Sequence, residues 1–244
     1  MADSHFDEPI ARHYDERSSD MFDPAVLGPT VDFLAELAGN GGALEFGVGT
    51  GRVALPLAER GVPVHGVDSS PAMVERLAAK PGGDAIGVTI GDFATTKVEG
   101  AFSLVYLVFN TIMNLTTQDE QVACFANAAE HLAPGGSFVI EVIVPEVQKL
   151  APGETIRPFA VEAAHLGFDE YDVANQTLVS HHYWFTDGEI HGHRVPFRYA
   201  WPAEFDLMAR MAGMTLEGRW ADWDRSPFTA DSPKHVSVWE KAAE

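Results

Sequence analysis

Apolar and polar positions follow a repeating order from the N-terminal region of this chain to about residue 145. Short apolar runs typical of buried strands alternate there with segments of helical period that end at glycine or proline. The expected strands are residues 43–46, 64–68, 85–90, 102–109 and 137–144, and the expected helices are residues 6–14, 31–37, 53–59, 71–79 and 119–132. Strands that alternate with helices predict crossover units and a parallel sheet covered on both faces.

The pattern changes after Pro145. Residues 165–200 alternate in the manner of antiparallel strands, and the tight-turn dipeptide Asp187-Gly188 separates residues 177–186 from residues 189–199. No linker in this stretch is long enough to isolate it as an independent domain. We therefore expect it to be an insertion on the main sheet.

The pattern is completed by a helix over residues 203–212 and strands over residues 215–223 and 235–239. These elements predict a single α/β domain over residues 1–244, built on a doubly wound, seven-stranded, mostly parallel sheet of Rossmann-like type. Residues 1–40 would form an N-terminal helical cap. Residues 146–200 would form a β-rich antiparallel insertion after strand five, acting as a substrate lid.

Composition and charge narrow the classes of partner. The formal net charge of −20 repels phosphate backbones and anionic membranes, so neither nucleic acid nor a membrane is an expected partner. The first residues have no signal-peptide pattern, and no apolar run approaches the ~18 residues needed to span a bilayer. The single cysteine, Cys124, fits a reducing compartment, and a cytoplasmic location is expected. A homodimer is compatible with the sequence.

A glycine-rich segment, EFGVGTGR at residues 45–52, follows one expected strand and precedes a helix, which is the context of a nucleotide-binding turn. A dinucleotide fingerprint requires Gly-x-Gly-x-x-Gly, whereas the glycines here are Gly47, Gly49 and Gly51. The carboxylate of Glu45 would repel a pyrophosphate and attract an α-ammonium group. The pattern therefore favours a ligand that carries an amino acid, and a tight turn without a ligand is the alternative.

Two further acidic residues follow expected strands. Asp68 ends the second strand, where an acidic side chain accepts hydrogen bonds from ribose hydroxyls. Its alternative role is to cap the following helix, for which Ser69 or Ser70 is better suited. After the third strand, Asp92 could accept from an exocyclic adenine amine and Phe93 offers apolar surface to the ring. The alternative for this pair is an ordinary polar loop with one buried aromatic residue.

Together these motifs resemble the class I S-adenosylmethionine-dependent methyltransferase family. The resemblance covers roughly residues 40–145, with the helix and the strand pair after Ala200. The matching segments are residues 45–51 for the first motif, 64–68 for the second, 91–93 for the adenine-side motif, 102–110 for the fourth strand and 132–136 for the turn before the fifth. The order and spacing of these motifs make the resemblance far more specific than any one of them.

The resemblance implies S-adenosyl-L-methionine as the cofactor. It places the methionine moiety against Glu45 and the glycine loop, the ribose against Asp68, and the adenine against Asp92 and Phe93. Met73 would flank the adenine ring, and either Arg52 or Tyr14 would reach the carboxylate. The cofactor-binding residues expected in this way are Glu45, Gly47, Gly49, Gly51, Arg52, Asp68, Ser69, Met73, Asp92 and Phe93.

The segment after the fourth strand helps to distinguish between classes of methyl acceptor. DNA amino-methyltransferases carry Asn/Asp-Pro-Pro-Tyr/Phe at this point, whereas residues 109–114 here read FNTIMN. That class is disfavoured, in agreement with the net charge. Small-molecule N- and O-methyltransferases are similar to this chain in size and in carrying a β-rich insertion.

The histidines of the insertion fall into a pattern. If Asp187-Gly188 is a two-residue turn, one face of the hairpin carries His182, Trp184, His191 and His193. The other face carries Tyr183, Phe185 and Ile190 and is expected to be core-like. The histidine face could line a substrate pocket or be a half-exposed sheet surface. No metal site is predicted, because no acidic or cysteine partner follows at metal-ligand spacing.

The predicted reaction is in-line transfer of the sulfonium methyl group to a nitrogen or oxygen nucleophile of a small molecule. The acceptor pocket should lie between the end of the fourth strand, the N-terminal helix and the histidine face. The candidate catalytic residues are Tyr14, Asn114, His182, His191 and His193. An NAD(P)-dependent oxidoreductase is the alternative enzyme, disfavoured by the glycine spacing. A non-catalytic nucleotide-binding module is the other alternative, disfavoured by the intact cofactor motifs.

Overall fold

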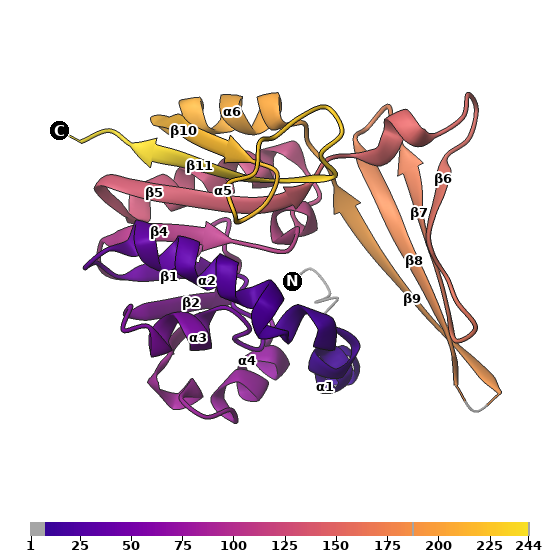
Figure 1. Ribbon diagram of the computed structural model, residues 1–244, viewed down its shortest axis with the longest axis horizontal. Coiled ribbons are helices and arrows are strands. Elements are labelled where there is room, and N and C mark those ends of the chain that lie inside the picture. The colour runs from indigo at the N-terminus through magenta and orange to yellow at the C-terminus, as the bar shows by residue number, and fades with distance from the viewer. Residues whose placement is uncertain (1–7, 187, 244) are drawn as a thin grey trace.

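A seven-stranded sheet forms the centre of the computed structural model, which describes residues 8–186 and 188–243. Its strand order is β10-β11-β5-β4-β1-β2-β3 (Figure 1). The strands are β1 (Ala43–Phe46), β2 (Val64–Asp68), β3 (Gly87–Ile90), β4 (Phe102–Leu107), β5 (Leu132–Ile143), β10 (Met214–Trp220) and β11 (Lys234–Lys241). Strands β1 to β5 pair in parallel, and β11 runs antiparallel to both β5 and β10. The doubly wound, mostly parallel sheet is confirmed.

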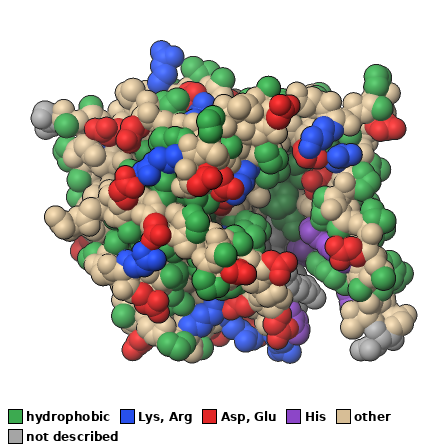
Figure 2. Space-filling view, in the orientation of Figure 1, with side chains coloured by type: hydrophobic (Ala, Val, Ile, Leu, Met, Phe, Trp, Pro, Cys, Tyr) green, Lys and Arg blue, Asp and Glu red, His purple; other side chains and the backbone are tan. Residues whose placement is uncertain are grey.

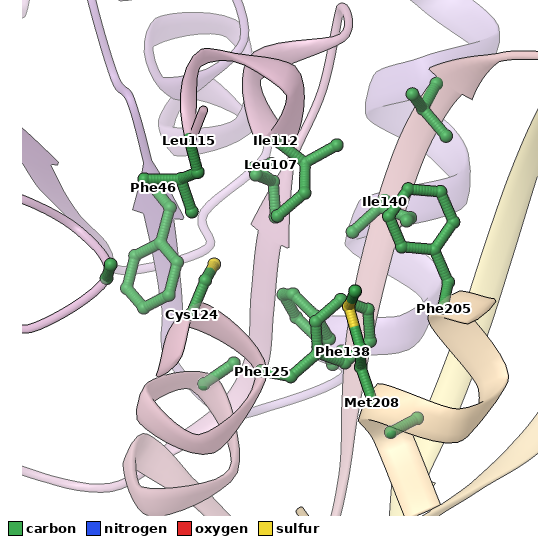
Figure 3. Packing of buried hydrophobic residues seen from close by; sticks show 14 of the residues in the cluster. Phe46, Leu107, Ile112, Leu115, Cys124, Phe125, Phe138, Ile140, Phe205 and Met208 are labelled. Atoms are coloured by element: carbon green, nitrogen blue, oxygen red, sulfur yellow. The ribbon is translucent and has the colours of Figure 1, made fainter. Parts of the chain in front are cut away.

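Helices cover both faces of this sheet. They are α1 (Glu8–Arg17), α2 (Pro24–Ala38), α3 (Ala54–Glu59), α4 (Pro71–Ala78), α5 (Gln118–His131) and α6 (Pro202–Met211), with short 3-10 turns η1 (Ser19–Phe22), η2 (Gly83–Ala85), η3 (Thr111–Asn114) and η4 (Glu146–Lys149). On the side of α5 and α6, Phe125 packs edge-on against Phe138 with ring centroids 5.0 Å apart (Figure 3). Phe125 also packs edge-on against Trp239, with centroids 5.3 Å apart. On the other side, Leu34 and Leu57 are fully buried in a second apolar cluster.

Side-chain caps explain where several helices begin. Ser70 accepts a hydrogen bond from the Met73 N–H at the start of α4, as expected for one of the two serines there. Helix α2 is longer than predicted because Asp23 caps it and a proline occupies its first turn. The predicted helix at residues 6–14 overlaps α1, and its first two residues, 6 and 7, lie outside the described residues. In the described part of the chain, no helix is long and apolar enough to cross a bilayer.

A second, four-stranded antiparallel sheet follows β5 and projects from the main body (Figure 1). Its strands are β6 (Ile156–Val161), β7 (His165–Asp172), β8 (Thr177–Thr186) and β9 (Glu189–Arg198). Thr186 pairs with Glu189 and His182 with His193, which is the predicted hairpin register. Asp187, half of the predicted turn, lies outside the described residues. Strand β6 escaped prediction because Pro158 interrupts its pattern, a residue that sheets tolerate at an edge.

The root of the second sheet is anchored in the main core. The Arg198 guanidinium donates to Gln121 Oε1 at 2.5 Å and to Glu204 Oε1 at 2.6 Å, and all three side chains are buried or nearly so. Leu178 and Tyr171 belong to the apolar cluster beneath α5 and α6. The side of the sheet that carries these two residues therefore faces the body, and we call it the inner face.

The opposite, outer face differs from expectation. Phe185 is 45% exposed and Ile190 is 66% exposed, so the prediction of a core-like face was wrong. Alternation along a strand separates two faces without telling which one is covered. The sheet is anchored through its root and inner face, and these two side chains lie near its far end.

Candidate active site

The candidate site lies at the carboxyl edge of the parallel strands. Glu45 stands near the end of β1, Asp68 ends β2, and Phe109 follows β4. Because β1 pairs with both β2 and β4 in parallel, these three positions meet at one edge of the sheet. Ligands of open α/β sheets bind in the crevice outside this edge.

The glycine loop has the backbone that its sequence requires. Gly47, Gly49 and Gly51 have φ of +71°, +53° and +79°, a region that other residues rarely adopt. A Cβ on Gly47 would meet Thr111 Cγ2 at 2.6 Å, so the loop packs tightly there. A Cβ on Gly49 would meet nothing nearer than 3.9 Å and would point into open space. The room beside Gly49 is where a ligand could approach the main chain.

Asp68 holds this loop in place. Its Oδ2 accepts the Gly49 N–H at 2.7 Å, and its Oδ1 accepts the Ser70 N–H at 2.8 Å. Burial raises the pKa of the carboxyl, and these backbone hydrogen bonds oppose that rise. The two carboxylate oxygens together offer about four acceptor positions, so Asp68 can still accept from a ribose hydroxyl with its backbone bonds in place.

Glu45 is a buried acid, with 3% of its surface exposed. Its Oε2 accepts a hydrogen bond from the Tyr106 hydroxyl at 2.9 Å. Burial raises the pKa of Glu45 to about 8, and the Tyr106 hydrogen bond and the Arg52 charge lower it in part. A bound ammonium group would supply the charge that this carboxylate lacks, so the side chain fits the amino-acid end of S-adenosylmethionine.

The N-terminal helix is tied to the glycine loop. Asp15 on α1 accepts from the Thr50 hydroxyl at 2.6 Å and pairs with Lys80 Nζ at 2.6 Å. These contacts bring Tyr14 to the site: burial raises the pKa of its phenol, Arg52 lowers it, and Asp68 and Glu45 are among the charges that raise it further. Asp15 and Lys80 were missed by sequence reasoning because each is an ordinary charged residue of an exposed helix or turn.

The chain bends sharply after β4. Phe109 and Asn110 have φ of 56° and 62°, a conformation that residues other than glycine seldom adopt. Glu141 on β5 holds the bend: its Oε2 accepts the Phe109 N–H at 3.1 Å, and Asn110 Oδ1 accepts the Ile143 N–H at 2.8 Å. The Arg52 guanidinium lies 5.2 Å from the Phe109 ring centroid. Strained backbone at a strand end of this kind is common at active sites.

Asn114 closes the turn that follows. Its Nδ2 donates to the Thr111 carbonyl at 3.1 Å, while its Oδ1 is buried without a hydrogen-bond partner among the described residues. A buried acceptor without a partner is costly, and a bound molecule could satisfy it. Strand β9 contacts η3, so Asn114 lies where the second sheet meets the carboxyl edge.

The residues expected at the adenine lie along the ends of β2 and β3. Phe93 stacks on the buried Phe46 ring, with centroids 5.9 Å apart, and Asp92 Oδ1 accepts the Ala94 N–H at 2.8 Å. Met73 is buried in α4, whereas Ser69 is exposed. Asp92 is thus partly used in its own turn, and Phe93 is supported from behind by the core.

The three predicted histidines His182, His191 and His193 share the inner face with Leu178, because residues two apart on a strand point the same way, whereas His181 points to the outer face. His182 and Trp184 are half-buried on this face, with ring centroids 5.3 Å apart. His193 is also half-buried, but the His191 side chain is 58% exposed. Figure 2 shows a hollow between the main body and the projecting sheet, with histidine side chains on its wall.

A cavity of about 380 Å³ adjoins the glycine loop on the side of α1 and η1. Gly51 and Arg52 line it from the loop, and Asp15 and Lys80 line it from α1 and the end of α4. It reaches neither Glu45 nor Asp68, so it lies beside the carboxyl edge rather than on it.

Comparison with known proteins decides the family. Residues 43–136 match the family described as "Methyltransferase domain". The structure of the CcbJ methyltransferase from Streptomyces caelestis is 42% identical, with 96% of each chain covered and a TM-score of 0.85. The chain is a class I S-adenosylmethionine-dependent methyltransferase. The methyltransferase is also similar to the cypemycin N-terminal methyltransferase of a Streptomyces species, 28% identical over 97% of both chains.

More distant relatives share the fold of this methyltransferase. The S-adenosylmethionine-bound structure of CalS10, an amino pentose methyltransferase from Micromonospora echinaspora, has a TM-score of 0.69 at 19% identity, covering 88% of this chain and 90% of that one. The predictions of the fold, the enzyme class and S-adenosylmethionine as cofactor are confirmed. The oxidoreductase and the non-catalytic module are excluded by membership of this family.

Proposed function

We propose that this methyltransferase acts on a nitrogen or oxygen nucleophile of a small molecule, with an amine nitrogen favoured. The observation that carries the proposal is the hollow bounded by the carboxyl edge and the inner face of the second sheet (Figure 2). Phe109 follows β4 and Asn114 lies in η3 at this edge, and Trp184 is half-buried on the inner face. The formal net charge of −20 argues against nucleic acid as the acceptor.

The preference for nitrogen draws on a relative. The cypemycin N-terminal methyltransferase is named for methylation at an N-terminus, which is an amine. At 28% identity over nearly the whole chain, the likeness supports the type of nucleophile better than the particular acceptor. A negatively charged protein also attracts a cationic amine from solution.

In this proposal, Glu45 and the glycine loop hold the amino-acid end of the cofactor and Asp68 holds the ribose. Arg52 or Tyr14 reaches the carboxylate. The adenine lies against the group formed by Ser69, Met73, Asp92 and Phe93. When bound, S-adenosylmethionine supplies a methyl group that is already activated on a sulfonium. The protein therefore aligns the acceptor and excludes water, and a base is needed where the nucleophile is protonated at rest.

The acceptor would lie between Tyr14 on α1, Asn114 in η3 and the inner face with His182, His191 and His193. Asn114 Oδ1 is suited to accept a hydrogen bond from an amine or hydroxyl. The imidazoles and the phenol are the neighbouring groups that can exchange a proton.

Incubation with S-adenosylmethionine and a panel of small amines and alcohols tests the proposal. Mass spectrometry should detect an amine that gains one methyl group, together with S-adenosylhomocysteine. A parallel panel of peptides and nucleic acids is the control. Methylation of nucleic acid or internal peptide positions, with no small amine or alcohol modified, would overturn the proposal.

A further inference from the structure

Four polar side chains form a row on the inner face of the second sheet. Asp169 and His165 lie on β7, and Ser180 and His182 lie on β8. Asp169 is paired directly with Ser180, and His182 is paired with Gly167, midway between Asp169 and His165. Strand alternation therefore places all four side chains on one side of the sheet, ordered from its root toward its far end.

The four side chains are close enough to interact in sequence. Asp169 lies directly across from Ser180; burial raises the pKa of its carboxyl, and the Ser180 hydroxyl opposes that rise. Ser180 Oγ lies 3.3 Å from His182 Nε2, and His182 Nδ1 lies 3.1 Å from His165 Nε2. The planes of the two imidazoles differ by 5°, so the rings lie parallel to each other.

The carboxylate at the root sets the direction of every bond. An ionised Asp169 is only an acceptor, so the Ser180 hydroxyl donates to it and presents lone pairs to His182. His182 then carries its proton on Nε2 and accepts at Nδ1. His165 must therefore carry its proton on Nε2, which leaves a lone pair on its Nδ1. That atom has no hydrogen-bond partner among the described residues.

Aromatic rings surround the imidazole end of the row. The Phe159 ring centroid is 5.1 Å from that of His182, and the Trp184 centroid is 5.3 Å from that of His165. Titratable groups that face the row include Tyr171 from β7, Arg157 from β6, Glu146 from η4, and His191 and His193 from β9. Phe159 and Trp184 thus flank the imidazoles, and Tyr171, Arg157 and Glu146 gather near Asp169.

We propose that this row orients His165 as a general base, with His165 Nδ1 as the atom that accepts the proton released by the methyl acceptor. The inference rests on the proposed function above. The lone pair of the amine or hydroxyl forms the new bond to the methyl carbon, and the carbon–sulfur bond breaks with its electron pair left on sulfur. The N–H or O–H proton passes to His165 Nδ1. The resulting imidazolium donates through Nε2 to His182, and the proton leaves to water after product release.

The roles within the row differ. His165 touches the reacting group and is the catalytic residue. His182, Ser180 and Asp169 are positioning residues, because they act by fixing the tautomer and orientation of His165. This division resembles the use of a buried carboxylate to orient a catalytic imidazole in hydrolases.

The first test needs no cofactor and no acceptor. ¹⁵N spectra of histidine-labelled protein should show His165 and His182 both protonated on Nε2, assigned with His165→Gln and His182→Gln. Asp169→Asn should disturb this pattern, because an amide can donate to Ser180 and reverse the bonds. Glu170→Gln is the matched control, since that carboxylate is adjacent in β7 and points to the outer face. A His165 protonated on Nδ1 at neutral pH would overturn this proposal.

The second test uses the acceptor identified by the panel above. His165→Ala should lower kcat by roughly 100-fold or more, the usual contribution of a general base, with unchanged cofactor affinity. Asp169→Asn should move the pH profile of kcat, and Glu170→Gln should leave it in place. His165→Gln provides the same measurement if the alanine variant does not fold. Turnover within about twofold of wild type in the His165 variants would overturn this proposal. The proposed function would still stand.

Discussion

Glu141 on β5 accepts a hydrogen bond from the main-chain N–H of Phe109, a residue held at φ 56° immediately beyond β4. The same carboxylate accepts from Trp223 Nε1 at 3.1 Å and from Lys234 Nζ at 2.9 Å. One acid therefore connects the strained bend at the candidate site with the loop before β11. Because it is buried and accepts hydrogen bonds from three donors, the Glu141 carboxylate is held in one position beneath the acceptor side of the site.

Glu141→Gln should weaken both stability and turnover. An amide offers one acceptor oxygen in place of two, so at least one of the three donors loses its partner, at a cost of about 1–3 kcal/mol. Phe109 would then relax from its bend and kcat would fall. Urea unfolding and steady-state kinetics measure the two effects. The control is Asp222→Asn, which removes the more exposed partner of Lys234 and should cost less than about 1 kcal/mol. Equal losses in the two variants would contradict this account.

Gly49→Val should abolish binding of S-adenosylmethionine while leaving the protein folded. The new side chain would enter the open space beside the loop, at a φ that also strains valine. Calorimetry measures the loss. Gly61→Val is the matched control, because Gly61 also has a positive φ and open surroundings but lies between α3 and β2. If both variants bind the cofactor equally well, the ligand does not occupy the space beside Gly49.

Glu45 should make the unliganded enzyme less stable as pH rises. Its pKa is raised from 4.5 to about 8 by burial, so the folded protein holds a proton that the unfolded chain has lost between these values. The stabilising contribution is complete below pH 4.5 and is lost as pH rises through about 8. Urea unfolding over this range should show the free energy of unfolding of wild type falling relative to Glu45→Gln. Parallel curves would show that Glu45 is ionised throughout.

Arg198→Met should destabilise the protein by about 3–5 kcal/mol, because it leaves the Glu204 charge without its buried partner. Replacing both Arg198 and Glu204 by methionine should cost less than the single change, since no charge is then stranded. Arg194→Met on the same strand is the control, because that side chain is exposed. Denaturant midpoints give the comparison, and a double variant less stable than Arg198→Met would refute the stranded-charge explanation.

Most of the correct predictions rest on patterns that are encoded within a few neighbouring residues. Glycine spacing and the acids that end strands are encoded within a few residues, so the loop at Gly49 and its neighbour Asp68 could be located in advance. The hairpin register was also predictable, because a two-residue turn fixes every pair beyond it. His182 and His193 are opposite each other for that reason.

Long-range contacts account for what was missed. The partnership of Glu141 with Phe109 joins residues 32 positions apart, and that of Asp15 with Thr50 joins residues 35 apart. Neither of these two hydrogen bonds is marked by a pattern in the sequence around its residues. The exposure of Ile190 was misjudged for a related reason: periodicity distinguishes the faces of a strand, whereas coverage of a face depends on where the whole sheet docks.

The position of β11 has a consequence for synthesis on the ribosome. Strand β5 pairs with β11, yet about 90 residues separate the end of β5 at Ile143 from the start of β11 at Lys234. Because the ribosome adds about 5–20 residues per second, synthesis of this stretch takes roughly 5 to 20 seconds, and one edge of β5 is unpaired during that time. The whole second sheet is made during that interval. Translation speed across this stretch should therefore govern how much newly made chain is captured by chaperones or aggregates.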